Sequence, residues 1–207
     1  MQKQAWTWTT PLFPARLVRW GHFGAPVLIF PTAGGDYEEI ERFQLVAALA
    51  PLIDQGRFKV YSVDGLNVRA RLSGTPNIDE AYDSYLCGDV LQRIRVDCQD
   101  PKIEPMLVGA SLGAQTAVDA LFRHPDAFRG VIAMSLRTTP MLPLSAEKLK
   151  SRAITIATGA GNYEDPNASK RLVGALGAKS IPCRFINWGA ERDHTWATWR
   201  DALPGLL

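Results

Sequence analysis

Residues Gly109-Ala110-Ser111-Leu112-Gly113 form a G-x-S-x-G sequence between a short apolar run and an alanine-rich segment. Where a buried strand passes sharply into a helix, this pattern holds the serine in a strained turn with its hydroxyl exposed. The N-terminus of the following helix directs N–H groups toward the place where an oxyanion would form. The pattern therefore predicts Ser111 as a nucleophile of acyl transfer, and the alternative is an ordinary glycine-rich turn.

A serine hydroxyl is a weak nucleophile until a base takes its proton, and the chain offers three histidines. His22 lies in a predicted opening hairpin, and His124 follows a predicted helix, where it suits a C-terminal cap. His194 comes directly after the last predicted strand, at the edge of the sheet where Ser111 is expected. We therefore predict His194 as the general base.

The third group should be a carboxylate that fixes the imidazole tautomer and stabilises the imidazolium. In one common chain order it follows the serine and precedes the histidine. Glu164 and Asp165 compete for this role in the loop after a predicted strand. Because Asp165 precedes Pro166 and suits a helix N-cap, we favour Glu164, with Asp165 as the second choice. Asp193 is a weaker choice, since it is adjacent to the histidine and sequence neighbours rarely face each other.

An oxyanion hole needs two convergent backbone donors. The N–H of Leu112, directly after the nucleophile, is the first candidate. The second is the N–H of Ala33, in the loop 31–36, where two following glycines let the backbone approach a bound ester closely. A phosphate-binding reading of this loop is weaker, because the loop lacks the Gly-Lys-Ser/Thr ending of a P-loop.

Short apolar runs alternate with longer amphipathic segments along the chain, which predicts βαβ units and a mainly parallel sheet covered by helices on both faces. A hairpin over 7–13 and 16–23, bending at Pro14, precedes this pattern. The predicted strands are 26–30, 58–63, 105–109, 130–135, 153–158 and 182–188, and the predicted helices are 37–54, 78–98 (capped by Asn77 or Asp79), 112–123, 167–176 and 195–203. The length of 207 residues, without repeats or linkers, predicts one α/β domain over 1–207.

Composition excludes several classes of protein. The 23 basic and 21 acidic residues leave a net charge of +2, and the basic residues are scattered, so we expect no nucleic-acid partner. No apolar run approaches the ~20 residues of a membrane span, so we expect no membrane partner. The first residues lack the apolar stretch of a signal peptide, which favours a cytoplasmic location.

Three cysteines, Cys87, Cys98 and Cys183, make an odd number without a C-x-x-C pair. This usage fits neither a disulfide framework nor a zinc site and predicts reduced, mostly buried thiols. A single disulfide between Cys87 and Cys98 is the alternative in an oxidising compartment.

These features resemble a small α/β-hydrolase of the putative-esterase group, which includes esterase D, feruloyl esterases and the mycolyltransferase antigens. The matching residues are Phe30–Gly35, Gly109–Gly113, Gly159–Asp165, and His194 followed by Trp196 and Trp199. The chain departs from the common pattern in Pro31-Thr32, which replace His-Gly, and in the acid motif. The resemblance implies an α/β-hydrolase fold without a lid domain, and a serine acyl-enzyme that needs no metal or cofactor.

The favoured function is a serine hydrolase of carboxylic esters, with an acyltransferase using the same triad or a non-catalytic binding module as alternatives. The connection 137–150 is too short for a helical lid, so we expect an open site that accepts a small or bulky ester. Candidate lining residues, each of which fits a surface or core position equally well, are Arg69, Arg71, Tyr37, Met141 and Trp196.

Overall fold

A computed structural model describes residues 1–66, 76–142 and 146–207 of the chain. Its sheet has eight strands in the order β1-β2-β4-β3-β5-β6-β7-β8. The strands are β1 (Lys3–Trp8), β2 (Ala15–Trp20), β3 (Ala25–Phe30), β4 (Phe58–Val63), β5 (Met106–Ala110), β6 (Gly130–Met134), β7 (Ala153–Thr158) and β8 (Arg184–Asn187). β2 pairs antiparallel with β1 and β4, and all other pairs are parallel, as the alternating pattern predicts.

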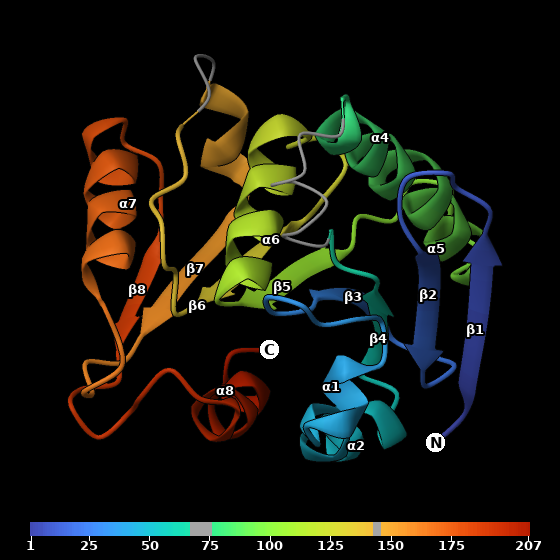
Figure 1. The fold of residues 1–207 in the computed structure, drawn as a ribbon, viewed down its shortest axis with the longest axis horizontal. Helices are drawn as coiled ribbons and strands as arrows, with labels where there is room; N and C mark the ends of the chain where they lie inside the picture. The colour runs from blue at the N-terminus through green and yellow to red at the C-terminus, as the bar shows by residue number, and fades with distance from the viewer. Residues whose placement is uncertain (67–75, 143–145) are drawn as a thin grey trace.

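Helices cover both faces of this sheet: α4 to α7 lie on one side, and α1, α2 and α8 lie on the other (Figure 1). The helical segments are α1 (Glu39–Arg42), α2 (Leu45–Asp54), α4 (Ile78–Ser84), the π-helical η1 (Tyr85–Val90), α5 (Leu91–Asp97), α6 (Leu112–Arg123), the 3₁₀ helix η2 (Glu147–Ser151), α7 (Asn167–Ala178), α8 (Trp196–Ala202) and η3 (Leu203–Gly205). Among the described residues, no helix combines the length and apolar composition that crossing a membrane requires.

The predicted helix over 37–54 is wrong as one continuous element. It is divided into α1 and α2 at Phe43 and Gln44, where Gln44 takes a left-handed backbone with φ of 63°. The Phe43 ring stacks on Trp196 of α8, with ring centroids 4.7 Å apart. The break thus lets the chain change direction while the apolar spacing of both halves continues.

The predicted helix over 78–98 is helical throughout but changes its winding in the middle. Six residues, Tyr85–Val90, form a π-helical segment between α4 and α5. Asn77 is the N-cap residue, yet it has a left-handed φ of 61° and its side chain makes no capping hydrogen bond. The predicted position of the cap is confirmed, and the predicted capping by a side chain is not.

The opening hairpin is confirmed, with both strands earlier in the chain than predicted. The last pair of its register is Trp8 with Ala15. The connection between them holds Pro11 and Pro14, and proline has no N–H to donate to a strand ladder. The two prolines therefore lie in the loop, outside the paired strands.

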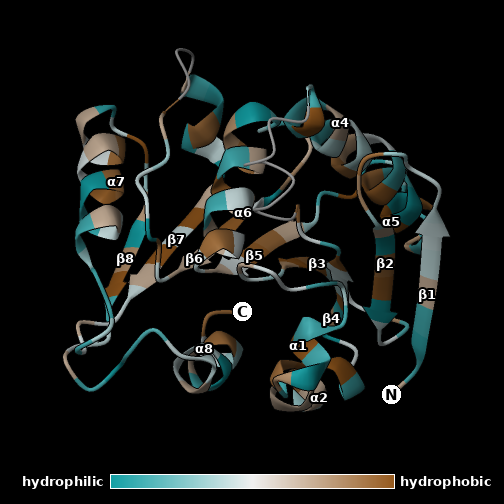
Figure 2. Cartoon of the chain, viewed as in Figure 1, coloured by the Kyte–Doolittle hydropathy of each residue, from teal (hydrophilic) through white to brown (hydrophobic). Residues whose placement is uncertain are grey.

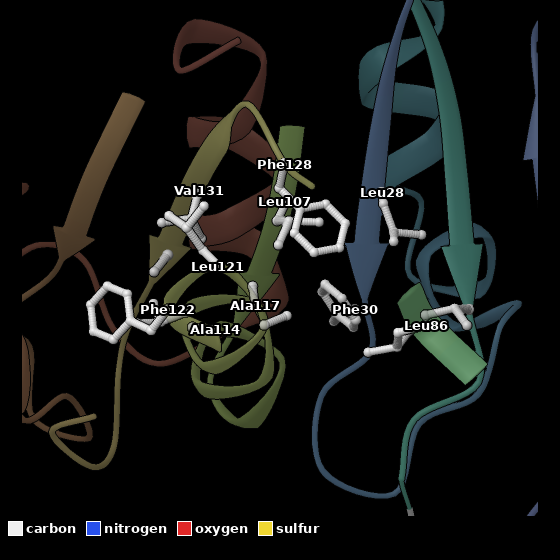
Figure 3. Packing of buried hydrophobic residues seen from close by; sticks show 14 of the residues in the cluster. Leu28, Phe30, Leu86, Leu107, Ala114, Ala117, Leu121, Phe122, Phe128 and Val131 are labelled. Carbon is white, nitrogen blue, oxygen red and sulfur yellow. The ribbon is translucent and has the colours of Figure 1, made fainter. Parts of the chain in front are cut away.

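Two apolar clusters, one on each face, hold the helices to the sheet. The larger packs α6 against β3 and β5: Figure 3 shows Ala117 and Leu121 of α6 near Leu107, with Phe30 facing them. Figure 2 shows the central strands as mainly hydrophobic, while α6 and α7 carry hydrophilic residues as well. The second cluster packs Leu49 of α2 and Trp199 of α8 against the other face.

All three cysteines are free and half-buried. The alternative disulfide between Cys87 and Cys98 is therefore not formed, and the three thiols are half-buried where the sequence predicts mostly buried ones. Burial raises the pKa of the Cys183 thiol to about 11, which keeps it protonated near neutral pH.

The turn from β5 into α6 depends on two glycines that have no room for a side chain. A Cβ atom on Gly109 would lie 2.1 Å from the carbonyl oxygen of Gly113, and one on Gly113 would lie 2.5 Å from the carbonyl oxygen of Phe30. Ser111 between them adopts φ of 56° and ψ of −122°. A non-glycine residue holds such a backbone only where its surroundings impose it. The strained turn predicted for Ser111 is thus confirmed.

We expect Gly109→Ala to lower the free energy of unfolding by about 1–3 kcal/mol or more, because the added methyl group must displace the backbone of α6. Gly174→Ala, on α7, is the matched control: nothing lies within 4 Å of its added methyl group. This control should raise the free energy of unfolding by roughly 0.5–1 kcal/mol through helix propensity. Urea denaturation of both variants tests this, and equal stability of Gly109→Ala and the wild type would contradict it.

Candidate active site

Ser111 lies at the carboxyl end of β5, in the centre of the sheet. Its N–H donates to the carbonyl of Met134 at the end of β6 (3.0 Å), and its own carbonyl accepts from Gln115 N–H in α6 (3.3 Å). The serine is half-buried. Both neighbouring elements therefore fix its backbone, while the side chain remains accessible.

Glu164 and His194 are in direct contact. The Oε1 atom of Glu164 lies 3.4 Å from Nδ1 of His194, and such pairs are often longer in a free enzyme than in its complexes. The Glu164 side chain is fully buried and that of His194 is 14% exposed. Oε1 also accepts the N–H of Asp165, whereas Oε2 is buried and has no hydrogen-bond partner among the described residues. A buried carboxylate aimed at Nδ1 would leave the other ring nitrogen, Nε2, to act on a substrate.

The two other candidate carboxylates make different contacts. Asp165 accepts the N–H of Asn167, the first residue of α7 (2.9 Å), so its side chain binds the start of the helix, but the N-cap residue is Pro166 and not Asp165 as predicted. Asp193 accepts the N–H of Tyr163 (2.6 Å), so it binds the loop that carries Glu164. Each of these carboxylates thus stabilises a backbone segment.

The loop with Glu164 and the loop with His194 are joined by backbone contacts as well. Ala160 N–H donates to Gly189 (2.9 Å), and Gly161 N–H donates to Arg192 (3.0 Å). A Cβ on Gly159 would lie 1.9 Å from the Arg192 carbonyl oxygen, so this approach requires glycine. Glu164 and His194 therefore lie on two loops that are joined by backbone hydrogen bonds.

An aromatic residue supports the imidazole from α8. The Trp199 ring meets the His194 ring edge to face, with centroids 5.0 Å apart. Its indole N–H donates to the hydroxyl of buried Ser135 at 2.9 Å. Ser135 follows β6 directly, so its hydrogen bond ties α8 to the same edge of the sheet.

Leu112 and Ala33, the predicted oxyanion donors, come from two elements that meet at Gly113. Leu112 is the first residue of α6, and the first N–H groups of a helix have no acceptor within the helix. Ala33 is exposed in the loop after β3. That loop closes with a bond from Gly35 N–H to the Thr32 carbonyl (3.1 Å).

The parallel strands bring these groups to one edge. Ser111, Ala33, Glu164 and His194 follow the carboxyl ends of β5, β3, β7 and β8, respectively. His22 belongs to the turn before β3, at the opposite edge. The predicted site residues therefore share an edge, where Glu164 and His194 are in direct contact.

The predicted lining residues lie in different environments. The guanidinium carbon of Arg16 lies over the Tyr37 ring, 4.3 Å from its centroid. The Met141 residue is 89% exposed, and the Trp196 ring stacks on Phe43. Arg69 and Arg71 lie outside the described residues.

One group of described residues has the chemistry to ligate a metal: Asp83, Cys87 and His124, whose donor atoms lie within 4.8 Å of one another. It sits at the other end of α6 from Ser111, about 18 Å along a twelve-residue helix. His124, the predicted helix cap, is indeed the C-cap residue of α6, and its Nε2 lies 2.7 Å from Asp83. Burial raises the pKa of the Cys87 thiol to about 12, and Arg123 approaches Asp83 at 3.8 Å. This group takes no part in the edge that holds Ser111.

Sequence reasoning missed the supporting roles of Asp193 and Ser135, and it did not consider Glu39. The sequence presents Asp193 only as a weaker candidate for the acid, since it is adjacent to the histidine. Glu39 follows the Gly34-Gly35 pair closely, but this spacing alone does not identify its partner. Its contacts are with Thr32, next to Ala33.

Comparisons with known proteins agree with this architecture. The chain superimposes on a ferulic acid esterase with a TM-score of 0.79 at 14% identity, covering 100% of this chain and 96% of that one. An S-formylglutathione hydrolase from Staphylococcus aureus superimposes with a TM-score of 0.74 at 11% identity, covering 99% of this chain and 96% of that one. A ferulic acid esterase from the anaerobic fungus Anaeromyces mucronatus superimposes with a TM-score of 0.71 at 13% identity, covering 98% of this chain and 88% of that one. At these identities the likeness establishes the fold, which is that of the α/β-hydrolases.

A search of curated protein sequences finds no match. The family model described as "Putative esterase" matches residues 44–207, which is most of the chain and includes Ser111, Glu164 and His194. The chain therefore belongs to the putative esterase family of carboxylic-ester hydrolases.

Proposed function

We propose that the chain hydrolyses carboxylic esters through an acyl-enzyme on Ser111, with His194 as general base and Glu164 as the acid of the triad. The observation that carries this proposal is the contact between buried Glu164 and Nδ1 of His194, made at the edge where Ser111 is held in its strained turn. Asp165 and Asp193 bind backbone N–H groups, which leaves Glu164 as the carboxylate that faces the ring.

In the first half of the reaction, Nε2 of His194 takes the proton of the Ser111 hydroxyl as Oγ attacks the ester carbonyl carbon. The carbonyl π electrons move to oxygen, and the N–H groups of Leu112 and Ala33 stabilise that negative charge. The carbonyl then re-forms, the alkoxy group leaves, and the imidazolium gives it the proton. Glu164 lowers the energy of the imidazolium and keeps Nδ1 protonated.

In the second half, water takes the place of the alcohol. His194 accepts a proton from the water as the hydroxide adds to the acyl carbon, and the same oxyanion donors stabilise the second tetrahedral intermediate. Its collapse releases the carboxylic acid and returns the proton to Ser111. An alcohol that competes with water here would make the same site an acyltransferase.

The substrate is proposed as a small or bulky ester. The stacked Phe43 and Trp196 rings lie beside Trp199, which supports His194. Such a group offers apolar surface for one half of an ester. A panel of p-nitrophenyl esters of increasing acyl length measures how far the acyl chain can extend.

Ser111→Ala should leave a folded protein whose esterase turnover is lower by roughly 10³-fold or more, because the nucleophile is removed. Ser151→Ala is the matched control: Ser151 is exposed and its hydroxyl bonds the Lys148 carbonyl in η2. A fluorophosphonate should modify the wild type and the control once, at Ser111. Unchanged turnover in Ser111→Ala, or a label on another residue, would overturn the triad.

Glu164→Gln should lower kcat by roughly 10²–10⁴-fold with little change in Tm, since a neutral amide cannot balance the imidazolium and favours the wrong tautomer. Asp165→Asn is the adjacent control and should be nearly silent, because asparagine caps a helix about as well as aspartate. Both variants are assayed on one ester. If Asp165→Asn loses turnover while Glu164→Gln keeps it, the assignment of the acid is reversed.

A further inference from the structure

Glu39 is a buried carboxylate that the mechanism above does not use. It is 5% exposed and begins the short helix α1. Both of its oxygens accept hydrogen bonds from one residue: Oε2 from the N–H of Thr32 and Oε1 from the Thr32 hydroxyl, each at 2.7 Å. A single side chain thus fixes both the backbone and the side chain of Thr32.

Burying a carboxylate is costly unless it serves specific partners. Burial raises the pKa of Glu39, and the hydrogen bonds from Thr32 oppose this shift. The nearby guanidinium of Arg42 pairs with Asp36 at 2.8 Å, so among the described residues Thr32 is the polar partner of Glu39. Burying the Glu39 carboxylate therefore costs folding free energy, and its hydrogen bonds hold one loop residue, Thr32.

The second glycine of the loop, Gly35, makes room for this carboxylate. A Cβ on Gly35 would lie 2.3 Å from Cδ of Glu39 and at most 2.5 Å from its two oxygens. Gly35 N–H in turn donates to the Thr32 carbonyl. Thr32 is thus held from both sides, through its N–H, its hydroxyl and its carbonyl.

These bonds also determine which N–H groups of the loop remain free. The donors of Thr32 and Gly35 are bound within the protein. Between them, the N–H groups of Ala33 and Gly34 have no acceptor among the described residues. Between Thr32 and Gly35, any donor offered to a substrate must then come from Ala33 or Gly34, and the direction of the Ala33 N–H is set by the peptide that Thr32 begins.

We propose that Glu39 is a positioning residue that holds Thr32, so that the N–H of Ala33 faces the oxyanion of the reacting ester. This inference rests on the proposed function, since it presumes acyl transfer at Ser111. Glu39 itself touches neither the substrate nor the triad. Its effect is expected in the transition state, where the charge on the carbonyl oxygen develops.

The test compares Glu39→Gln with Glu38→Gln on one p-nitrophenyl ester. Glutamine has one acceptor oxygen and would bring an NH₂ group against a Thr32 donor. We expect kcat to fall roughly 10–100-fold with KM changed by no more than about two-fold, a partial loss of one oxyanion donor. Glu38, whose Oε1 pairs with Lys3 at the surface, is the matched control and should keep both constants near those of the wild type.

A second variant separates positioning from general stability. Thr32→Val removes the hydroxyl that Glu39 accepts, while the N–H remains, and it should lower kcat several-fold. If Glu39 acts through Thr32, the double variant should lose less activity than the product of the two single losses. Thr32→Val also serves if Glu39→Gln does not fold, because an unchanged kcat in Thr32→Val would then overturn the proposal.

Failure of this inference is distinct from failure of the proposed function. A wild type that hydrolyses the ester and is labelled at Ser111, together with a Glu39→Gln variant that matches Glu38→Gln in kcat, overturns the role of Glu39 alone. A wild type without ester turnover and without a label at Ser111 overturns the proposed function, and this inference falls with it. A rise in KM with unchanged kcat in Glu39→Gln overturns positioning in the transition state.

Discussion

The close approach of α6 to β5 and to the loop after β3 is the constraint on which the site depends. At Gly109 and Gly113 the backbones meet with no space for a Cβ atom. This contact forces Ser111 into its left-handed turn and places the first N–H groups of α6 beside the loop that carries Ala33. The proposed nucleophile and the proposed oxyanion donors are therefore brought together by one packing contact between main chains.

The same edge is stabilised by hydrogen bonds to polar side chains. Asp193 binds the loop of Glu164, and Glu39 binds the loop of Ala33. Ser135 holds Trp199 against the imidazole of His194. Loops are the most mobile parts of an ordinary domain, and here the loops of Glu164 and Ala33 each donate a backbone N–H to a buried or half-buried carboxylate. Preorganisation of this kind is what electrostatic stabilisation of a transition state requires.

Much of the fold could be predicted from the sequence because its signals are local. The apolar run 26–30 and the strand over 58–63 lie where the pattern predicts, and α6 has the predicted bounds 112–123. The break at Gln44 could not be predicted, because the apolar spacing continues through it and a left-handed glutamine has no signature in the pattern. The change to π-helical winding in η1 was missed for the same reason.

Some residues of the candidate site could likewise be predicted from local sequence signals, and others could not. Ser111 stands in a motif tied to a specific turn, and His194 follows from where the last strand ends. The preference for Glu164 rests on the chemistry of a helix cap, and Asp165 does accept the N–H of Asn167. The partners of Glu39 and Asp193 are loop residues brought close by folding. No periodicity relates such residues, so their contacts required the structure.

The most direct test of the central claim is the identity of the acylated residue. The wild type and His194→Ala are mixed with p-nitrophenyl acetate, quenched in acid within the first turnovers, and digested for mass spectrometry. The account predicts an acetyl group on the peptide with Ser111 in the wild type and its loss in His194→Ala. Acetyl on another residue of the wild type, or an equally fast acetylation of Ser111 without His194, would contradict it.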